Sequence, residues 1–465
     1  MIPDRLQPVL DHIAARDDDY VARLIDYVRH PSISAHDIGI REVSDLLVSM
    51  LGKLGMQVEA VATKGHPFVL ARYIVDPAKP TVLLYGHYDV QPPDPLELWD
   101  SPPFEPTIRN GRIYARGVGD NKGQHFAQIM AIEAHLAVHG TLPCNVIFLL
   151  EGEEEIGSPQ IADFVRDHRD RLQADLVVTA DGPLHESGRA TLTYGVRGMC
   201  SFELRVRTAA RDAHSGNYGG VMPNAIWTLV HLLGSMKTPD GRITIDGLHA
   251  PIIPASEAEI DAAKALPLDL PGYMAKMGLA KLDAPADRPF WDRLMFHPTL
   301  TINGLHGGYG GPGSKSVLPS EAVAKCDIRL VEAMTPDQVM DCVRAHVARH
   351  APEVEVIFHG GMLPSKTPFA DPWGKVVQQA ITTARGVPPL VYPCAGGSLP
   401  DYVFTKILGV PAYVMPYANA DEANHAPNEN LEIDLFLMGI RTGAALLDRL
   451  GQAVDHASTA GAMAN

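Results

Sequence analysis

The segment TVLLYGHYDV (residues 81–90) shows a pattern that recurs along the chain: an unbroken apolar run leads directly into His87 and Asp89. A strand that is apolar at every position is typical of a parallel sheet covered by helices on both faces. Three further runs have this character: NVIFLL (145–150), LVVT (176–179) and VPAYVM (410–415). Because helical stretches separate the runs, the sequence predicts an α/β fold with a mixed, largely parallel sheet sandwiched by helices.

The middle of the chain has a different pattern. SFELRV (201–206) and AKCDIRL (324–330) alternate apolar and polar residues, as expected of strands with one exposed face. Helical periodicity at 223–236 and 336–350 lies between strand-like segments. These features predict a small α+β domain.

The order of the two patterns along the chain indicates an insertion. We expect one discontinuous domain made of residues 1–196 and 365–465, interrupted by the α+β domain of residues 197–364. A Pro-rich stretch, 250–298, forms an excursion within the inserted domain.

The chain of 465 residues carries 39 Lys and Arg against 55 Asp and Glu, which gives a formal net charge of −16. Proteins that bind nucleic acid or anionic lipid need a basic face, so this balance argues against either partner. The longest apolar stretch, 225–236, contains His231 and is shorter than the roughly 18 residues of a membrane span. We therefore expect no nucleic-acid partner and no membrane partner.

Two features bear on the cellular compartment. The first ten residues, MIPDRLQPVL, lack the basic and apolar regions of a secretory signal. The five cysteines are scattered and never form a C-x-x-C pair, which indicates neither a disulfide framework nor a thiolate zinc site. We expect a cytoplasmic protein.

Acidic residues and histidines follow the apolar runs, at the point where each run ends. The clusters are, in the order of the runs, His87 with Asp89, EGEEE (151–155), Asp181 and, after a loop, His425. A further acid, Asp120, lies in the Gly-rich turn ARGVGDNKG (115–123). Because the carboxyl ends of parallel strands form the functional crevice of open α/β sheets, we expect these side chains to converge.

Two imidazoles and at least three carboxylates at one place indicate a divalent metal site. Without cations, so many acids would repel one another and their pKa values would rise. Zinc accepts His nitrogen and carboxylate oxygen, and two ions about 3.5–4 Å apart need a bridging carboxylate. Since no thiolate ligand is indicated, zinc, manganese and cobalt all fit the donor set.

Each cluster taken alone has an ordinary structural explanation. A His-x-Asp pair can hydrogen-bond within a loop, an acidic run suits a helix N-terminus, and Asp120 can be a turn residue. Their joint occurrence at strand ends favours the metal site.

Two other enzyme classes are disfavoured by spacing. In residues 117–123 the third glycine comes one residue late for a dinucleotide loop, and in 308–316 Ser314 separates the glycine from the lysine of a phosphate loop. No G-x-S-x-G motif lies at a strand-to-helix turn, which argues against a serine hydrolase.

Nine motifs follow one another along nearly the whole chain. They are GHYDVQP (86–92), WDSPPFEP (99–106), GRIYARGVGDNKG (111–123), LLEGEEEIGS (149–158), DAHSGNYGG (212–220), PGSKSVLP (312–319), KCDIRLV (325–331), GGSLP (396–400) and NHAPNE (424–429). With them the chain resembles the di-zinc peptidases that include carnosine dipeptidases, carboxypeptidase G, aminoacylase and succinyl-diaminopimelate desuccinylase. Its length and the 250–298 excursion are most similar to the dipeptidase branch.

The resemblance implies two Zn²⁺ per chain, with Mn²⁺ or Co²⁺ as alternatives. His87 and Asp181 would bind one ion and Glu155 and His425 the other, while Asp120 would bridge both. The peptide bond after Asp120 is typically cis in such proteins. The discontinuous domain would be the di-metal catalytic domain, and the inserted one a lid and dimerisation domain.

Two further residues of the catalytic domain receive roles from the resemblance. Asp89 would orient the imidazole of His87. Aligning EGEEEIGS on its trailing Gly-Ser makes Glu154 the general base and Glu155 the metal ligand.

The inserted domain would contribute substrate contacts. The resemblance implies that His214 reaches the active site of a second copy in a homodimer and stabilises the oxyanion there. Arg329 would bind the substrate's carboxylate, a bidentate task that suits a guanidinium. Ser398 would donate to the same carboxylate, and Ser316 is a weaker candidate.

The implied activity is hydrolysis of dipeptides or short peptides that have a free C-terminal carboxylate, by a metal-bridged water that Glu154 activates. An N-acyl-amino-acid amidohydrolase or deacylase would use the same site and is the alternative. A catalytically silent relative would be expected to lack metal ligands, whereas all five are present here.

Overall fold

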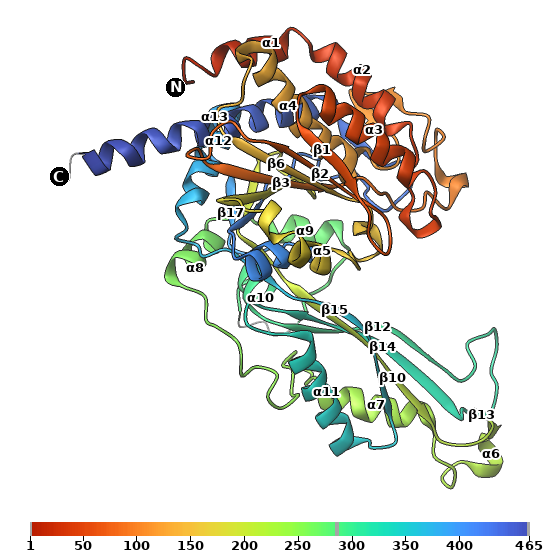
Figure 1. Ribbon diagram of the computed structural model, residues 1–465. Coiled ribbons are helices and arrows are strands. Elements are labelled where there is room, and N and C mark those ends of the chain that lie inside the picture. The colour runs from red at the N-terminus through yellow and green to blue at the C-terminus, as the bar shows by residue number, and fades with distance from the viewer. Residues whose placement is uncertain (1, 284–287, 463–465) are drawn as a thin grey trace. The chain divides into compact units, whose positions relative to one another are not determined.

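The computed structural model describes residues 2–283 and 288–462, and side chains up to residue 453. The chain divides into two compact units, each described by itself (Figure 1). Unit 1 comprises the chain up to Gly195, Lys366–Tyr392 and the chain from Val403 onward; unit 2 comprises Val196–Ser365 and Pro393–Tyr402.

An eight-stranded sheet forms the centre of unit 1. In spatial order its strands are β1 (Gln57–Val61), β2 (Phe68–Tyr73), β6 (Asn145–Glu151), β3 (Thr81–His87), β7 (Leu176–Thr179), β18 (Ala412–Val414), β8 (Thr191–Thr193) and β17 (Leu390–Tyr392). A small sheet of β19 (Asn430–Glu432), β5 (Arg112–Tyr114) and β4 (Thr107–Arg109) lies apart from it.

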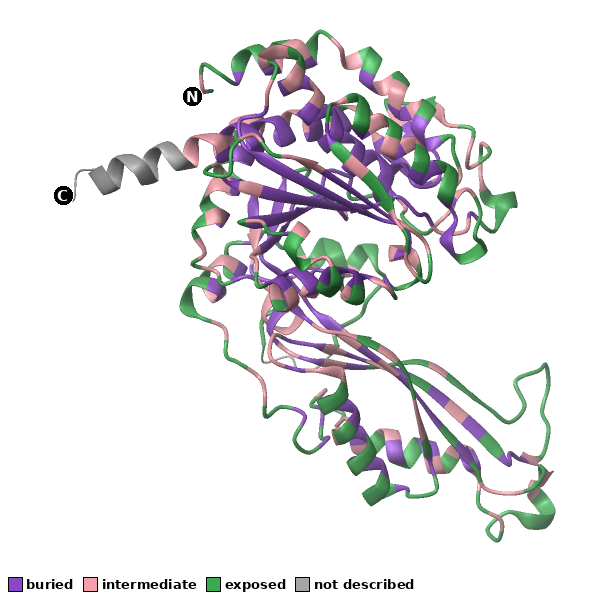
Figure 2. Cartoon of the chain, in the orientation of Figure 1, coloured by how far each residue is buried: buried purple, intermediate pink, exposed green. Residues whose placement is uncertain are grey.

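The four central strands β6, β3, β7 and β18 are neighbours and all parallel. They correspond to the four apolar runs of the sequence, and their residues are almost all buried, as the purple strands of Figure 2 show. The predicted α/β class with a mixed, largely parallel sheet is therefore confirmed.

The unbroken apolar character of these strands has a simple cause, because both faces of the sheet are covered. On β3, Val82 and Leu84 join the core beneath one helical layer. Tyr85 points to the other face, where its ring lies 5.3 Å from that of Phe404. The first layer contains α1 (Gln7–Ala14), α2 (Asp17–Val28), α3 (Ile40–Lys53), α4 (Gly123–His139), α12 (Pro372–Arg385) and α13 (Ile433–Ala462).

The second layer is smaller. It consists of α5 (Ile161–Asp167) and η6 (Val403–Leu408). Phe164 of α5 stacks on Phe68 of β2 with ring centroids 4.1 Å apart. No helix in the described part of the chain is both long and apolar enough to cross a membrane.

Unit 2 is built on a four-stranded antiparallel sheet. Its strands are, in spatial order, β12 (Thr299–Gly307), β14 (Glu321–Leu330), β10 (Gly198–Arg207) and β15 (Glu355–Met362). Helices α7 (Ala225–Met236) and α11 (Pro336–His350) pack on one face. Along β14 the core residues Ala324, Cys326 and Ile328 alternate with polar ones, so Arg329 faces away from these helices.

Shorter elements complete unit 2. At one end of the sheet lie β11 (Ala213–His214), β13 (Val317–Leu318) and α6 (Ser215–Tyr218). The Pro-rich excursion contains three short helices, α8 (Glu257–Lys264), α9 (Leu270–Lys276) and α10 (Phe290–Phe296).

One segment lies in a different unit from the one we expected. We predicted residues 393–402 within the discontinuous domain, but in the structure they belong to unit 2. The reason is hydrogen bonding: Arg197 donates to the carbonyl oxygen of Gly396, and Arg329 donates to Ser398.

Candidate metal centre

The candidate metal ligands of unit 1 all lie where strands or turns end at one edge of the sheet. His87 is the last residue of β3, and Asp181 comes two residues after β7. Glu155 lies in η4 (Glu154–Ile156), just after β6, and Asp120 in η3 (Val118–Lys122), just before α4. His425 lies in the loop between β18 and β19.

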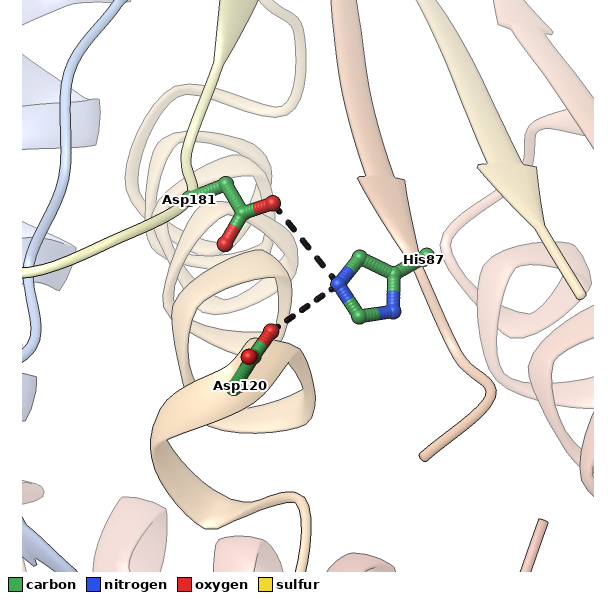
Figure 3. Close-up of side chains that lie close together, drawn as sticks. All are labelled: His87, Asp120 and Asp181. Carbon is green, nitrogen blue, oxygen red and sulfur yellow. Dashed lines mark hydrogen bonds and ion pairs between the residues drawn. The ribbon is translucent and has the colours of Figure 1, made fainter. Parts of the chain in front are cut away.

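Figure 3 shows that Asp120 and Asp181 point toward the same imidazole nitrogen of His87. The Nε2 atom of His87 lies 3.1 Å from Oδ1 of Asp120 and 3.7 Å from Oδ2 of Asp181. All three side chains are buried, and their donor atoms lie within 4.8 Å of one another. This spacing is compatible with three ligands around one ion.

A second group lies on the other side of Asp120. Nε2 of His425 is 3.1 Å from Oδ2 of Asp120 and 3.1 Å from Oε2 of Glu155. The two carboxylate oxygens of Asp120 thus face two different ligand groups. A carboxylate shared in this way has the arrangement that a pair of metal ions requires. The peptide bond between Asp120 and Asn121 is cis, as the resemblance implies.

The protonation of the group reflects competition between burial and pairing. Burial and the charge of Asp120 raise the pKa of Asp181 to about 7. Burial acts against ionisation of Asp120 too, but hydrogen bonds from His425 and His87 hold its pKa below the ordinary value. For His87 burial disfavours the cation, yet hydrogen bonds to Asp120 and Asp89 raise its pKa well above the ordinary value. The site concentrates negative charge that divalent cations would neutralise.

Asp89 ties the first ligand to the acidic loop. The backbone carbonyl of Asp89 lies 3.1 Å from Nδ1 of His87, and its carboxylate Oδ1 lies 3.4 Å from the same nitrogen. The carboxylate also accepts the backbone N–H groups of Glu154 and Glu155 at 3.1 and 3.0 Å. Asp89 therefore orients both an imidazole and the loop that carries two further candidate residues.

Three adjacent glutamates have different environments. Glu155 faces His425 and Asp120, as described above. Burial, followed by the charges of Asp181 and Asp120, raises the pKa of Glu154 well above the ordinary value. Glu153 lies in a separate place, with its carboxylate close to Gly65. Of the three, Glu154 combines a raised pKa with electrostatic interactions with His87, Asp181 and Asp120.

The turn that carries Asp120 is held by a residue to which the sequence assigned no role. The buried carboxylate of Glu429 accepts the backbone N–H groups of Gly117, Gly119 and Asp120 at 2.9–3.0 Å. It also pairs with the buried guanidinium of Arg116 at 2.7 Å. Glu429 closes the motif NHAPNE, but its partners lie some 310 positions earlier, so no local pattern indicated its function.

A second buried acid to which the sequence assigned no role is Glu422. A Cβ on Gly119 would come within 2.4 Å of the Glu422 carboxylate, so the two are in close contact. Burial and the charges of Asp120 and Glu429 raise the pKa of Glu422 well above the ordinary value. Neither of its oxygens has a hydrogen-bond partner in the described part of the chain.

The remaining candidates belong to unit 2 and form two separate pairs. His214 is the last residue of β11. The N–H of Ser215, which follows it, donates to the carbonyl oxygen of Ser316 at 3.1 Å. Arg329 donates from Nη1 to Oγ of Ser398 at 2.8 Å. The two pairs lie at opposite ends of β14, whose eight-residue separation from Glu321 to Arg329 corresponds to about 26 Å.

We expect zinc binding to release protons. Hydrogen bonds to Asp120 and Glu155 raise the pKa of His425 to about 10, so at about pH 7.5 the metal-free site keeps a proton that a metal ion must displace. The apparent zinc affinity should therefore rise with pH and level off once the pH exceeds that pKa. Calorimetry in two buffers of different ionisation enthalpy measures the released protons.

Substitution of His425→Gln should lower the number of protons released, whereas His350→Gln, on α11 of unit 2, should leave it unchanged. Zinc binding that releases no proton at about pH 7.5 would contradict this description of the site.

The known proteins to which this chain is similar include peptidases. The sequence model of peptidase family M20/M25/M40 matches residues 83–449 of this chain. The Cys-Gly metallodipeptidase dug1 of Schizosaccharomyces pombe is 31% identical over 464 residues, covering 94% of this chain and 96% of that protein. The Beta-Ala-His dipeptidase of Homo sapiens is 29% identical over 479 residues, covering 97% and 94%.

A solved structure of the same family is also similar to this chain. The M20 family metallo-carboxypeptidase Sso-CP2 from Sulfolobus solfataricus superposes with a TM-score of 0.86 at 33% identity, covering 93% of this chain and 99% of that one. The extent of these matches and the ligand groups around Asp120 lead to one assignment. The chain belongs to peptidase family M20/M25/M40 and is a peptidase hydrolase.

Proposed function

We propose that this protein hydrolyses the peptide bond of dipeptides or short peptides with a free C-terminal carboxylate, in a reaction that depends on two metal ions. The observation that carries the proposal is the shared carboxylate of Asp120, with one oxygen toward His87 and the other toward His425. Two similar proteins bear the names of dipeptidases, one for Cys-Gly and one for Beta-Ala-His.

The donor set fits two zinc ions, or manganese or cobalt in their place. His87, Asp181 and Asp120 would hold one ion, and Glu155, His425 and Asp120 the other. Such a pair of ions, when bound, lowers the pKa of the attacking water and polarises the scissile carbonyl.

Glu154 would move the proton. Burial, the largest cause, raises the pKa of Glu154, which makes its carboxylate a stronger proton acceptor than an ordinary glutamate. The carboxylate accepts a proton from the attacking water and later gives it to the leaving amine. Because Asp89 accepts the backbone N–H of Glu154, the position of the base is tied to that of His87.

Substrate binding would fall to unit 2. Arg329 offers a guanidinium on the polar face of its sheet, and Ser398, held by Arg329, adds a hydroxyl donor. Together they would bind the substrate's α-carboxylate, a task that suits a planar cation with several donors. Ser316 lies near His214 and far along the sheet from Arg329, so it remains the weaker candidate for substrate binding.

We further propose that the active form is a homodimer. His214 and Arg329 are separated by about the length of β14, roughly 26 Å, so one small substrate cannot contact both within one copy. A second copy that supplies His214 removes this difficulty, and the histidine would then stabilise the oxyanion.

A surface suited to such a dimer exists on unit 2. The edge strand β12 exposes Ile302 and Leu305, the latter at 47%. Helix α7 exposes Val230 and Trp227, the latter at 59%. Exposed apolar side chains beside an unpaired strand edge favour association with another chain. We call these four residues the β12–α7 surface.

The alternative substrate is an N-acyl amino acid, which presents the same amide and carboxylate to the same residues. The two similar proteins named above favour dipeptides. A location in the cytoplasm remains a prediction from the sequence.

Substitution of Glu154→Gln should lower kcat by about 10²–10⁴-fold for any dipeptide that the wild-type protein cleaves, because the proton acceptor is lost. Bound zinc, measured by atomic emission, should stay at the wild-type level. Release of amino acids from a dipeptide panel, with a chelated control, measures the rate.

Two matched variants test whether the adjacent glutamates have the proposed roles. Glu153→Gln should remain within a few-fold of wild-type activity, and Glu155→Gln should lose bound zinc. Normal turnover by Glu154→Gln, or loss of activity in Glu153→Gln with Glu154→Gln unaffected, would refute the proposed roles.

Substitution of Leu305→Asp should convert the dimer to a monomer, since it buries a charge in the β12–α7 surface. Sedimentation velocity measures the mass, and dipeptide hydrolysis should fall in parallel because His214 is then missing from the site. Val387→Asp, an exposed apolar position in unit 1, is the control. A wild-type monomer with full activity would overturn the dimer proposal.

A further inference from the structure

A large cavity of about 1130 Å³ lies within unit 2. Among the described residues that line it, seven are Lys or Arg and two are Asp. This excess of positive charge is unusual in a chain whose formal net charge is −16. The cavity therefore has a charge that would attract anions.

Arg197 and Arg329 form part of the cavity wall, and both donate hydrogen bonds to the loop that contains Gly396 and Ser398. Arg197 is only 6% exposed, and its Nε and Nη2 atoms donate to the carbonyl of Gly396 at 2.9 and 2.7 Å. Its buried Nη1 atom has no hydrogen-bond partner in the described part of the chain. A buried guanidinium without a carboxylate is costly, and a bound anion would offset that cost.

Helix α10 adds one further cation, Arg293, to the same wall. A Cβ placed on Gly396 would meet Leu294 of α10 at 2.8 Å and Arg197 at 3.4 Å, so these three residues are contiguous. Arg293, the neighbour of Leu294, also lines the cavity. The helix leads into β12, where Thr299 pairs directly with Arg329. Arg293 therefore belongs to the same part of unit 2 as Arg329.

Neither aspartate of the cavity pairs with Arg197 or Arg293. Asp327 lies 3.6 Å from Nε of Arg329, and Asp283 pairs with Lys237 at 3.3 Å. Arg293 donates to the backbone carbonyl of Asp283, which carries no charge. Neither Arg197 nor Arg293 forms an ion pair with a carboxylate among the residues that the structure describes. Positive charge is thus left for a ligand.

We propose that this cavity binds the side-chain carboxylate of an acidic C-terminal residue, so that dipeptides ending in Glu or Asp are preferred substrates. The proposal rests on the proposed function, in which Arg329 binds the α-carboxylate at the cavity wall. In the C-terminal residue of the substrate, the side chain and the α-carboxylate are attached to the same Cα atom. When Arg329 binds the α-carboxylate, the side chain can therefore enter the cavity. There Arg293 would supply a charge-assisted hydrogen bond.

Matched dipeptides that differ only in charge test the proposal. For the zinc-loaded full-length protein we expect kcat/KM to be about tenfold or more higher for Ala-Glu than for Ala-Gln. Substitution of Arg293→Met should bring the two values to within about twofold, and Arg293→Lys should retain part of the preference. Arg344→Met, an exposed cation on α11 outside the cavity, should keep the wild-type ratio.

Binding provides a readout independent of turnover. Dissociation constants of the same two dipeptides, measured by calorimetry on the Glu154→Gln variant, should show the same order and the same loss on adding Arg293→Met.

The possible failures can be told apart. If no dipeptide is hydrolysed in a metal-dependent way, the proposed function fails. If dipeptides are hydrolysed but Ala-Glu and Ala-Gln are equivalent, only the acidic-residue proposal is overturned. The same holds if Ala-Gly-Gly is cleaved better than every dipeptide while charge has no effect, because the cavity would then serve a longer chain.

Discussion

The shared carboxylate of Asp120 is the interaction on which the rest of this structure depends. Its two oxygens face two histidines, each at 3.1 Å, and each histidine has a further acid beside it. This geometry is possible because Glu429 accepts the N–H groups of Gly117, Gly119 and Asp120 in the turn and pairs with Arg116. A buried acid whose charge is balanced by Arg116 thus fixes the position of a second acid, Asp120, whose charge divalent cations would balance.

The two units contribute opposite charges to the proposed reaction. In the proposal, unit 1 would supply the anionic ligand group and the base Glu154, and unit 2 would supply guanidiniums for the substrate's carboxylates. Separation of this kind lets residues on one unit define the chemistry while residues on the other define the substrate. The length of β14 adds a constraint of its own, because it keeps His214 away from Arg329 within a single copy. We therefore propose that assembly, and not folding alone, completes the site.

The sequence predicted the sheet and the ligand positions for related reasons. Four apolar runs became four adjacent parallel strands, and residues such as His87 and Asp181 were placed together because parallel strands end at one edge. Other features depend on distant pairings that leave no local pattern. Glu429 acts on amides some 310 positions away, and the Gly396 loop joins unit 2 through a hydrogen bond from Arg197. The cationic cavity likewise gathers residues spread from 197 to 329.

The central claim is that Asp120 bridges two metal ions. Anomalous X-ray diffraction at the zinc edge, on crystals grown with zinc, tests it most directly. The account predicts two peaks per chain, one near His87 and Asp181 and one near Glu155 and His425, each within coordination distance of a different oxygen of Asp120. A single peak, or two peaks of which only one contacts Asp120, would contradict it.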